Sequence, residues 1–175
     1  FQKVGARFLK TMGSPLLADA PGLGKTIQTI AALEDRGPTL VLCPNSLKYS
    51  WVAEIDKWSP LSKIGVINGS KLERIEQWAT PGKNFYVANY ELLLHDFEQI
   101  PKEWDVIVCD EATRISNPVA KTTKALKKLT AKKRIALTGT PISNSPNDIY
   151  SIIDWVVPRY LGTYWNFLER YCIRE

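Results

Sequence analysis

Short apolar runs alternate with longer amphipathic segments along most of the chain. Residues 39–43 form an almost continuous apolar run that Pro44 closes, which predicts a strand covered on both faces. Trp51, Ile55 and Trp58 are spaced three and four residues apart, and this spacing predicts one buried face of a helix. These two patterns predict strands over 16–18, 39–43, 64–67, 85–88, 106–109 and 135–138, and helices over 26–33, 47–58, 71–78, 90–97, 121–129 and 148–156.

Regular alternation of strands and helices predicts βαβ units, and hence an α/β fold with a mostly parallel sheet and helices on both faces. In folds of this kind, ligands bind beyond the carboxyl ends of the strands. Asp19, Asp110 and Thr138 each stand at or just past the end of a predicted strand. We therefore expect these three residues to lie near a ligand at one edge of the sheet.

The composition is that of a single domain. Of the 175 residues, 45% are hydrophobic and 23% are charged, which suits one domain with a core and excludes a disordered chain. No apolar run approaches the roughly 20 residues that span a bilayer, and no signal peptide is visible. The net charge of +5 suits an anionic partner, but it is common among soluble domains and does not identify one.

Cysteine and histidine usage narrows the chemistry further. The three cysteines, Cys43, Cys109 and Cys172, show no C-x-x-C spacing and leave an odd count. This pattern argues against disulfides and against a zinc site, and it predicts a reducing, intracellular compartment. His95 is the only histidine, so a metal site built from a histidine cluster is excluded.

A glycine-rich loop over residues 19–26 separates the first predicted strand from the first predicted helix. Glycines let the backbone curl so that its N–H groups point at an anion, and the helix that follows adds its positive end. Lys25 can reach the β- and γ-phosphates of a nucleotide, and the Thr26 hydroxyl can hold Mg²⁺. The strict motif has Gly where Asp19 stands, but the ending Gly-Leu-Gly-Lys-Thr disfavours a plain turn. The residues expected to hold ATP in this loop are Pro21, Gly22, Leu23, Gly24, Lys25 and Thr26.

Two acids follow the apolar run 106–109. At the end of that predicted strand, the carboxylate of Asp110 can hold Mg²⁺ beside the γ-phosphate. Glu111 can orient or deprotonate the attacking water. A solvated acidic pair is the ordinary alternative, but the glycine-rich loop makes the catalytic interpretation the better one. Lys25, Asp110 and Glu111 are therefore the candidate catalytic residues, with Thr26 and Asp110 as the candidate metal ligands.

These motifs and their surroundings resemble the Swi/Snf-type ATPases of helicase superfamily 2 over nearly the whole chain. The segments that match, in the family's order, are 17–26, 40–47 with Trp51, Glu54 and Trp58, 88–91, 110–113, and 137–141 with Asn144 and Tyr150 beyond. The resemblance implies that residues 1–175 are a single N-terminal RecA-like P-loop lobe and that a second lobe follows downstream. Thr113 replaces the histidine that usually ends the acidic box, and Ala20-Pro21 replaces a Glu-Met pair.

The resemblance also implies roles that spacing alone does not assign. Gln2 would contact adenine. Thr138, Gly139 and Thr140 would form the motif that couples the state of ATP to the grip on nucleic acid. The implied function is ATP hydrolysis of the helicase or translocase type, with double-stranded DNA and the second lobe as partners and no membrane. The contacts expected with the nucleic-acid backbone are Pro44, Asn45, Ser46, Lys48 and Asn89.

Several alternatives stay open. The chain could be a lobe of an RNA or single-strand helicase, a nucleotide-binding scaffold that does not hydrolyse ATP, or a small-molecule kinase. Intact Lys25 and Glu111 count against a scaffold, and the 138–140 motif would have no purpose in a kinase. The basic stretch 121–134 could contact phosphates, but a solvated helix face is the favoured interpretation.

The tryptophans divide into two groups. Trp51, Trp58 and Trp78 have apolar neighbours at helical spacing, so we expect them in the core. Trp155 and Trp165 are candidates for the face on which a second lobe would dock.

Overall fold

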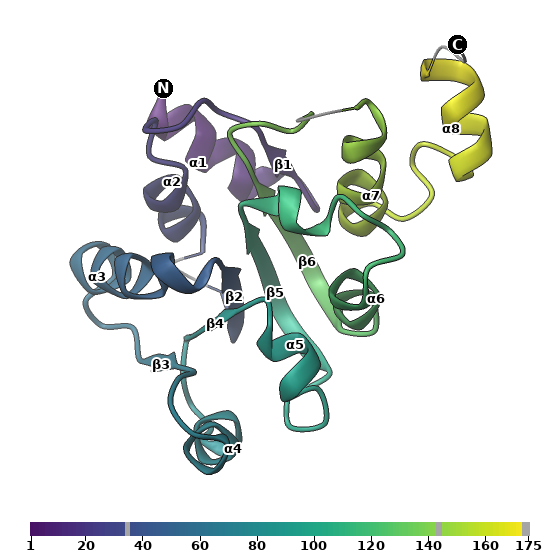
Figure 1. Cartoon of the computed structure of the whole chain (residues 1–175). Helices are drawn as coiled ribbons and strands as arrows, with labels where there is room; N and C mark the ends of the chain where they lie inside the picture. The colour runs from purple at the N-terminus through teal and green to yellow at the C-terminus, as the bar shows by residue number, and fades with distance from the viewer. Residues whose placement is uncertain (34–35, 143–144, 173–175) are drawn as a thin grey trace.

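Six strands form one sheet at the centre of the molecule (Figure 1). The computed structural model describes residues 1–33, 36–142 and 145–172. Among these residues every strand pairing is parallel, and the strand order is β1-β6-β5-β2-β4-β3. The predicted parallel α/β architecture is therefore confirmed. The strands are β1 (Leu16–Leu17), β2 (Thr39–Cys43), β3 (Ile64–Val66), β4 (Phe85–Asn89), β5 (Glu103–Asp110) and β6 (Thr130–Leu137).

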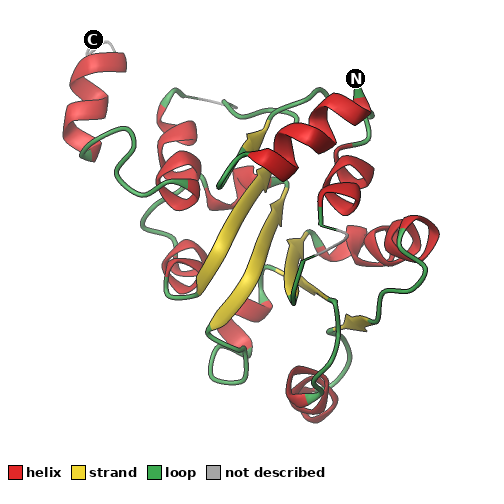
Figure 2. Cartoon of the chain, turned by 180° about the vertical axis from the view of Figure 1, so that it is seen from behind, coloured by secondary structure: helices red, strands yellow, loops and turns green. Residues whose placement is uncertain are grey.

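Helices cover both faces of this sheet (Figures 1 and 2). In the described part of the chain, none of them is long and apolar enough to cross a membrane. The α-helices are α1 (Gln2–Thr11), α2 (Lys25–Ala32), α3 (Lys48–Trp58), α4 (Lys71–Ala79), α5 (Leu92–His95), α6 (Lys121–Lys127), α7 (Asn147–Val156) and α8 (Tyr164–Tyr171), and the short 3-10 helices are η1 (Asn45–Leu47) and η2 (Ala112–Ile115).

The two faces of the sheet bury two separate cores. Successive side chains of a strand point to opposite faces, so β2 divides its apolar residues between them. Leu40 and Leu42 pack in the core beneath α4, α5, α6 and α7. Val41 and Cys43 pack in the core beneath α1, α2 and α3. Burial on both faces is the reason that β2 has no polar alternation.

The two central strands begin earlier than the apolar runs predicted. Both β5 and β6 have eight residues, and only their carboxyl-terminal halves are continuously buried. In their first halves, polar residues such as Glu103, Asp105 and Lys132 interrupt the apolar pattern, so that pattern marked only the continuously buried part. The basic stretch 121–134 is accordingly not one helix face. Its last three cationic residues, Lys132, Lys133 and Arg134, lie on β6.

Helices α1 and α8 were not among the predicted elements. Each buries one large apolar residue, Leu9 in α1 and Phe167 in α8, so neither has the apolar stripe of a core helix. Thr163 caps the start of helix α8, and its hydroxyl accepts a hydrogen bond from the Asn166 N–H. It lies beyond α7, away from the sheet (Figure 1).

The tryptophans depart from the expected pattern at two positions. Trp51 and Trp78 are buried as predicted, but Trp58 is 48% exposed, and its indole donates to Glu54 on the surface of α3. Trp155 is fully buried in the core, so it does not offer a docking surface, whereas Trp165 is 65% exposed. A helical spacing fixes which residues share a face, but it does not fix how far the neighbouring layer extends over that face.

A buried ion pair fastens α4 to the segment after α5. Arg74 donates two hydrogen bonds to Asp96, of 2.7 Å to Oδ2 and 2.8 Å to Oδ1. The Trp78 indole adds a third of 3.1 Å. Burial raises the pKa of Asp96, but the hydrogen bonds from Arg74 and Trp78 outweigh it and hold the pKa below its usual value. The charged form of Asp96 therefore stabilises the folded state.

We expect Asp96→Asn to lower the free energy of unfolding by about 2–3 kcal/mol at pH 7, because it leaves the partly buried Arg74 without a counter-charge. A folded pKa below the unfolded value of about 4 contributes stability above that value, which is lost as the pH falls through the folded pKa. The gap between wild type and variant should therefore narrow below about pH 4. Urea denaturation against pH measures both quantities. The exposed control Glu98→Gln should stay close to wild type, and a gap that persists unchanged into acid would contradict the ion pair's role.

Candidate active site

A cavity of about 400 Å³ opens at the carboxyl ends of β1 and β5. The glycine-rich loop that follows β1 forms one wall, and the acidic pair at the end of β5 forms another. The start of α3 adds a third wall that the motifs did not indicate. The lining residues are Pro21, Gly22, Gly24, Lys25, Thr26, Ile27, Leu47, Ser50, Glu54, Asp110 and Glu111.

The loop has the curled backbone that an anion site requires. Gly22 and Gly24 both have positive φ, of 82° and 75°, a conformation that side chains other than glycine adopt at a cost. Gly24 is the N-cap of α2, so the first N–H groups of that helix follow the loop directly. A Cβ at residue 24 would lie 2.5 Å from Nε2 of Gln2. The structure thus places Gln2 against the loop, while its contact with adenine stays a prediction.

Lys25 is folded back over its own loop. Its Nζ donates to the carbonyl oxygens of Asp19, at 2.8 Å, and Ala20, at 3.3 Å. Thr26 lies in the first turn of α2 and lines the same cavity. Both residues therefore line the cavity, and their roles toward phosphate and Mg²⁺ stay predictions.

Gln28 of α2 donates hydrogen bonds to the loop, a role that no sequence motif indicated. It is 1% exposed, and its Nε2 donates to Asp19 Oδ2 at 3.2 Å and to the Leu23 carbonyl at 3.1 Å. The Asp at position 19 is thereby held from α2. Gly5 of α1 leaves room for this amide, since a Cβ there would lie 1.6 Å from its Oε1. A polar residue on the buried face of α2 was the available signal.

Asp110 is held on all sides at the end of β5. It is 7% exposed. The Trp51 indole donates to its Oδ2 at 2.8 Å, and the Glu111 N–H donates to its Oδ1 at 3.0 Å. The Tyr90 hydroxyl donates to its backbone carbonyl at 2.8 Å. Burial raises the pKa of Asp110, while these N–H donors and the charge of Lys25 act in the opposite direction.

Glu111 adopts a left-handed backbone conformation, with φ 50° and ψ 57°. A residue other than glycine held in this region costs on the order of 1 kcal/mol or more, and such residues cluster at active sites. The conformation turns the chain from β5 into η2 and leaves Glu111 on the cavity wall beside Asp110. Both acids thus lie at the cavity, as predicted.

The segment 138–140 touches the phosphate loop directly. The Thr138 N–H donates to the Leu17 carbonyl, continuing the pairing of β1 with β6, and the Thr138 hydroxyl accepts from the Thr140 N–H. A Cβ at Gly139 would lie 2.8 Å from both Cγ and Cδ of Pro21. The two loops are therefore in contact through one glycine and one proline ring. Asn144, which the family resemblance included, lies outside the described residues.

The candidate nucleic-acid contacts divide into two groups. Pro44, Asn45 and Ser46 lie at the carboxyl end of β2, and Asn45 and Ser46 are exposed in η1, so their role stays a prediction. The predicted contact of Lys48 with the nucleic-acid backbone does not fit the structure, because Lys48 is only 3% exposed. Its Nζ donates to the Ile67 carbonyl and to the side-chain oxygens of two asparagines, Asn68 and Asn89. That network occupies both Lys48 and the Asn89 oxygen.

An anion-binding loop that opens toward a buried strand-end carboxylate is the arrangement of P-loop nucleotide-binding domains. Residues 1–174 match the family model of the SNF2-related domain, and the chain belongs to this family. The Sulfolobus solfataricus SWI2/SNF2 ATPase core in complex with dsDNA is similar in structure, with a TM-score of 0.83 and 35% sequence identity over 98% of this chain. This match confirms the predicted RecA-like fold.

Similar curated proteins come from plants and animals. "Switch 2" of Arabidopsis thaliana is 31% identical over 97% of this chain. The "DNA repair and recombination protein RAD54B" of Homo sapiens is 36% identical over 89% of it. The chain spans 22% of the length of the plant protein, 19% of the human protein and 37% of the archaeal structure.

The contact between Pro21 and Gly139 predicts how a methyl group added at position 139 would affect ATP binding. Overpacking of this size costs roughly 1–3 kcal/mol, so Gly139→Ala should weaken ATP binding about tenfold if the phosphate loop is what gives way. Pro21→Ala removes the two ring carbons that the new Cβ meets. The double variant should therefore regain most of the lost affinity, as measured by calorimetric titration of ATP.

Gly13→Ala is the matched control, because nothing lies within 4 Å of a Cβ at that position. It should bind ATP like the wild type. Equal losses in Gly139→Ala and in the double variant would show that the two loops are not coupled through Pro21.

Proposed function

We propose that this chain is the nucleotide-binding lobe of a DNA-dependent ATPase that couples ATP hydrolysis to translocation on, or remodelling of, double-stranded DNA. The observation that carries this proposal is the single cavity that joins Lys25 and Thr26 to Asp110 and Glu111. The loop and the acidic pair are more than 80 residues apart in sequence, and a phosphate-transfer site needs both.

Each residue has a definite role in this proposal. The loop N–H groups and Lys25 hold the phosphates, which take the place of the Asp19 and Ala20 carbonyls as acceptors for the ammonium. Glu111 orients the attacking water and accepts its proton. Gln2 packs beside the loop and is our candidate for the adenine contact.

Oxygen ligands for Mg²⁺ are available at the same cavity. The carboxylate of Asp110 and the hydroxyl of Thr26 are the hard oxygen donors that this ion prefers. Each Asp110 oxygen accepts one N–H and keeps a lone pair for a further partner. When bound, the ion would neutralise charge on the phosphates.

Duplex DNA is the partner that the comparisons favour. The solved SWI2/SNF2 core is described as a complex with dsDNA. Asn45 and Ser46, two exposed polar residues of η1, can donate hydrogen bonds to backbone phosphates. Contacts of this kind position a protein without reading base sequence. An intracellular, reducing location follows from a nucleic-acid substrate and agrees with the cysteine usage.

Two substitutions in the full-length protein test the catalytic assignment. Lys25→Ala should weaken ATP binding severely, because it removes the cation that faces the phosphates. Glu111→Gln should keep ATP affinity and lose hydrolysis by a factor of about 10² or more, because only water activation is removed. Calorimetry measures the first property and steady-state phosphate release the second. Wild-type turnover in Glu111→Gln would refute the assignment, and matched melting temperatures would exclude misfolding.

The chain by itself should be a poor enzyme. Among the described residues no arginine lines the cavity, and an arginine that stabilises the transition state contributes about 10³ to 10⁵ in rate. We propose that a second lobe supplies it. Residues 1–175 should therefore bind Mg-ATP, hydrolyse it near background, and show no stimulation by duplex DNA. Phosphate release with and without DNA measures this, and strong stimulation of the isolated monomer would contradict the two-lobe proposal.

A further inference from the structure

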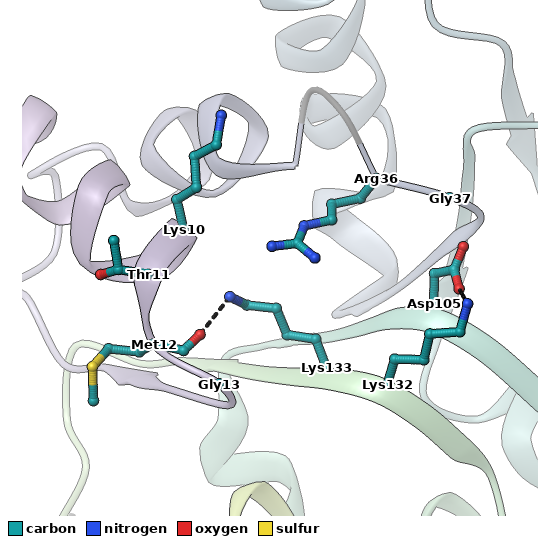
Figure 3. Close-up of a pocket in the computed structure, with 9 residues that line it drawn as sticks. All are labelled: Lys10, Thr11, Met12, Gly13, Arg36, Gly37, Asp105, Lys132 and Lys133. Carbon is teal, nitrogen blue, oxygen red and sulfur yellow. Dashed lines mark hydrogen bonds and ion pairs between the residues drawn. The ribbon is translucent and has the colours of Figure 1, made fainter.

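A second cavity, of about 420 Å³, is drawn in Figure 3. It lies near the amino-terminal ends of β5 and β6, whereas the phosphate loop lies at the carboxyl end of β1. It is bounded by the first halves of β5 and β6, by the last turn of α1 with the two residues after it, and by the residues before β2. Asp105 on its wall precedes Asp110 by five residues of the same strand, a span of roughly 17 Å at 3.3 Å per residue. The cavity is therefore separate from the candidate ATP site.

The floor of this cavity holds a buried cation. Lys133 is 6% exposed, and its ammonium donates to the carbonyl oxygens of Leu9 and Met12 at the end of α1. The ammonium complements the negative end of the α1 dipole, but its two acceptors carry no formal charge. In the described part of the chain Lys133 forms no ion pair. Burial lowers the pKa of Lys133, and the charge of Arg36 lowers it further.

A second cation faces the first. Figure 3 shows the Arg36 guanidinium and the Lys133 ammonium pointing into the same part of the cavity. The carboxylate on the wall, Asp105, is already ion-paired with Lys132 at the far side. Two like charges therefore face each other, the exposed Arg36 and the buried Lys133, and no described carboxylate lies between them. The end of α1 explains the position of Lys133, but it does not explain why Arg36 points at it.

We propose that this cavity binds a phosphate group between Arg36 and Lys133. A guanidinium offers paired N–H donors that match two phosphate oxygens, and an ammonium adds a compact point charge. An anion there would remove the repulsion between the two cations and give the buried Lys133 a counter-charge in addition to its two carbonyl acceptors. The ligand is defined by this chemistry, whether it is a free phosphate or a backbone phosphate of DNA.

Inorganic phosphate is the first probe. All proteins in this titration carry Lys25→Ala, which removes the main cation of the ATP site. Phosphate should bind with one saturable site at millimolar or lower concentration, and Arg36→Gln should weaken it at least tenfold. Arg170→Gln is the matched control, since it removes an exposed arginine of α8 and should leave the affinity unchanged. Lys133→Gln should also lose phosphate, with its melting temperature reporting any damage at the end of α1.

A second arm identifies the source of the phosphate. Duplex DNA is titrated, without nucleotide and at several salt concentrations, into protein that retains Lys25. If the site takes a backbone phosphate, Arg36→Gln lowers the slope of log affinity against log salt by about 1. An unchanged slope, together with lost phosphate binding, assigns the site to a free phosphate or a small phosphorylated molecule. Phosphate binding that does not saturate, or that is equal in Arg36→Gln and Arg170→Gln, overturns the proposal.

Discussion

The hydrogen bond from Trp51 to Asp110 is the interaction on which the candidate site depends. Asp110 must be buried at the end of β5 to face the phosphate loop, yet a buried carboxylate is costly unless donors surround it. The indole of Trp51 on α3 and the Glu111 N–H each donate to one carboxylate oxygen, and the Tyr90 hydroxyl fixes the backbone by donating to the Asp110 carbonyl. The position of the carboxylate is therefore a property of the assembled layers and not of the strand alone.

Close backbone approaches set the geometry of the loops around this carboxylate. Three glycines each leave room for a neighbour that a methyl group would displace. Gly5 admits the Gln28 amide, Gly24 admits Gln2, and Gly139 admits the Pro21 ring. Through these contacts, α1, α2 and the segment after β6 all lean on one phosphate loop. A change of shape in the loop therefore affects α1, α2 and the segment after β6, which is a physical basis for coupling between the nucleotide and the rest of the lobe.

Because all the strands run in the same direction, their carboxyl-terminal ends and their amino-terminal ends lie on opposite sides of the sheet and carry different kinds of residue. At the carboxyl edge, apolar strand ends pass into glycine-rich and acidic turns, and the candidate ATP site forms there. At the amino-terminal ends of the strands, β5 begins with Glu103 and Asp105 on either side of the buried Trp104, and β6 carries the cationic residues Lys132 and Lys133. The apolar runs in the sequence marked only the covered halves of these strands. The first halves of the two strands became visible as part of the sheet only through their pairing.

The sequence by itself determined what depends on neighbours along the chain. The apolar runs indicated all six strands, the glycine pattern located the phosphate loop, and the acids at the end of β5 identified the opposite wall, because each signal lies within a few consecutive residues. Only the tertiary structure decided what depends on distant partners. It buried Lys48 among carbonyl and amide oxygens and left Trp58 half exposed. It also brought Trp51 within hydrogen-bonding distance of Asp110, and Gln28 within hydrogen-bonding distance of Asp19. Burial and hydrogen bonding across layers join residues that are far apart in sequence, such as Trp51 and Asp110, which are 59 positions apart, and no local pattern encodes such a pairing.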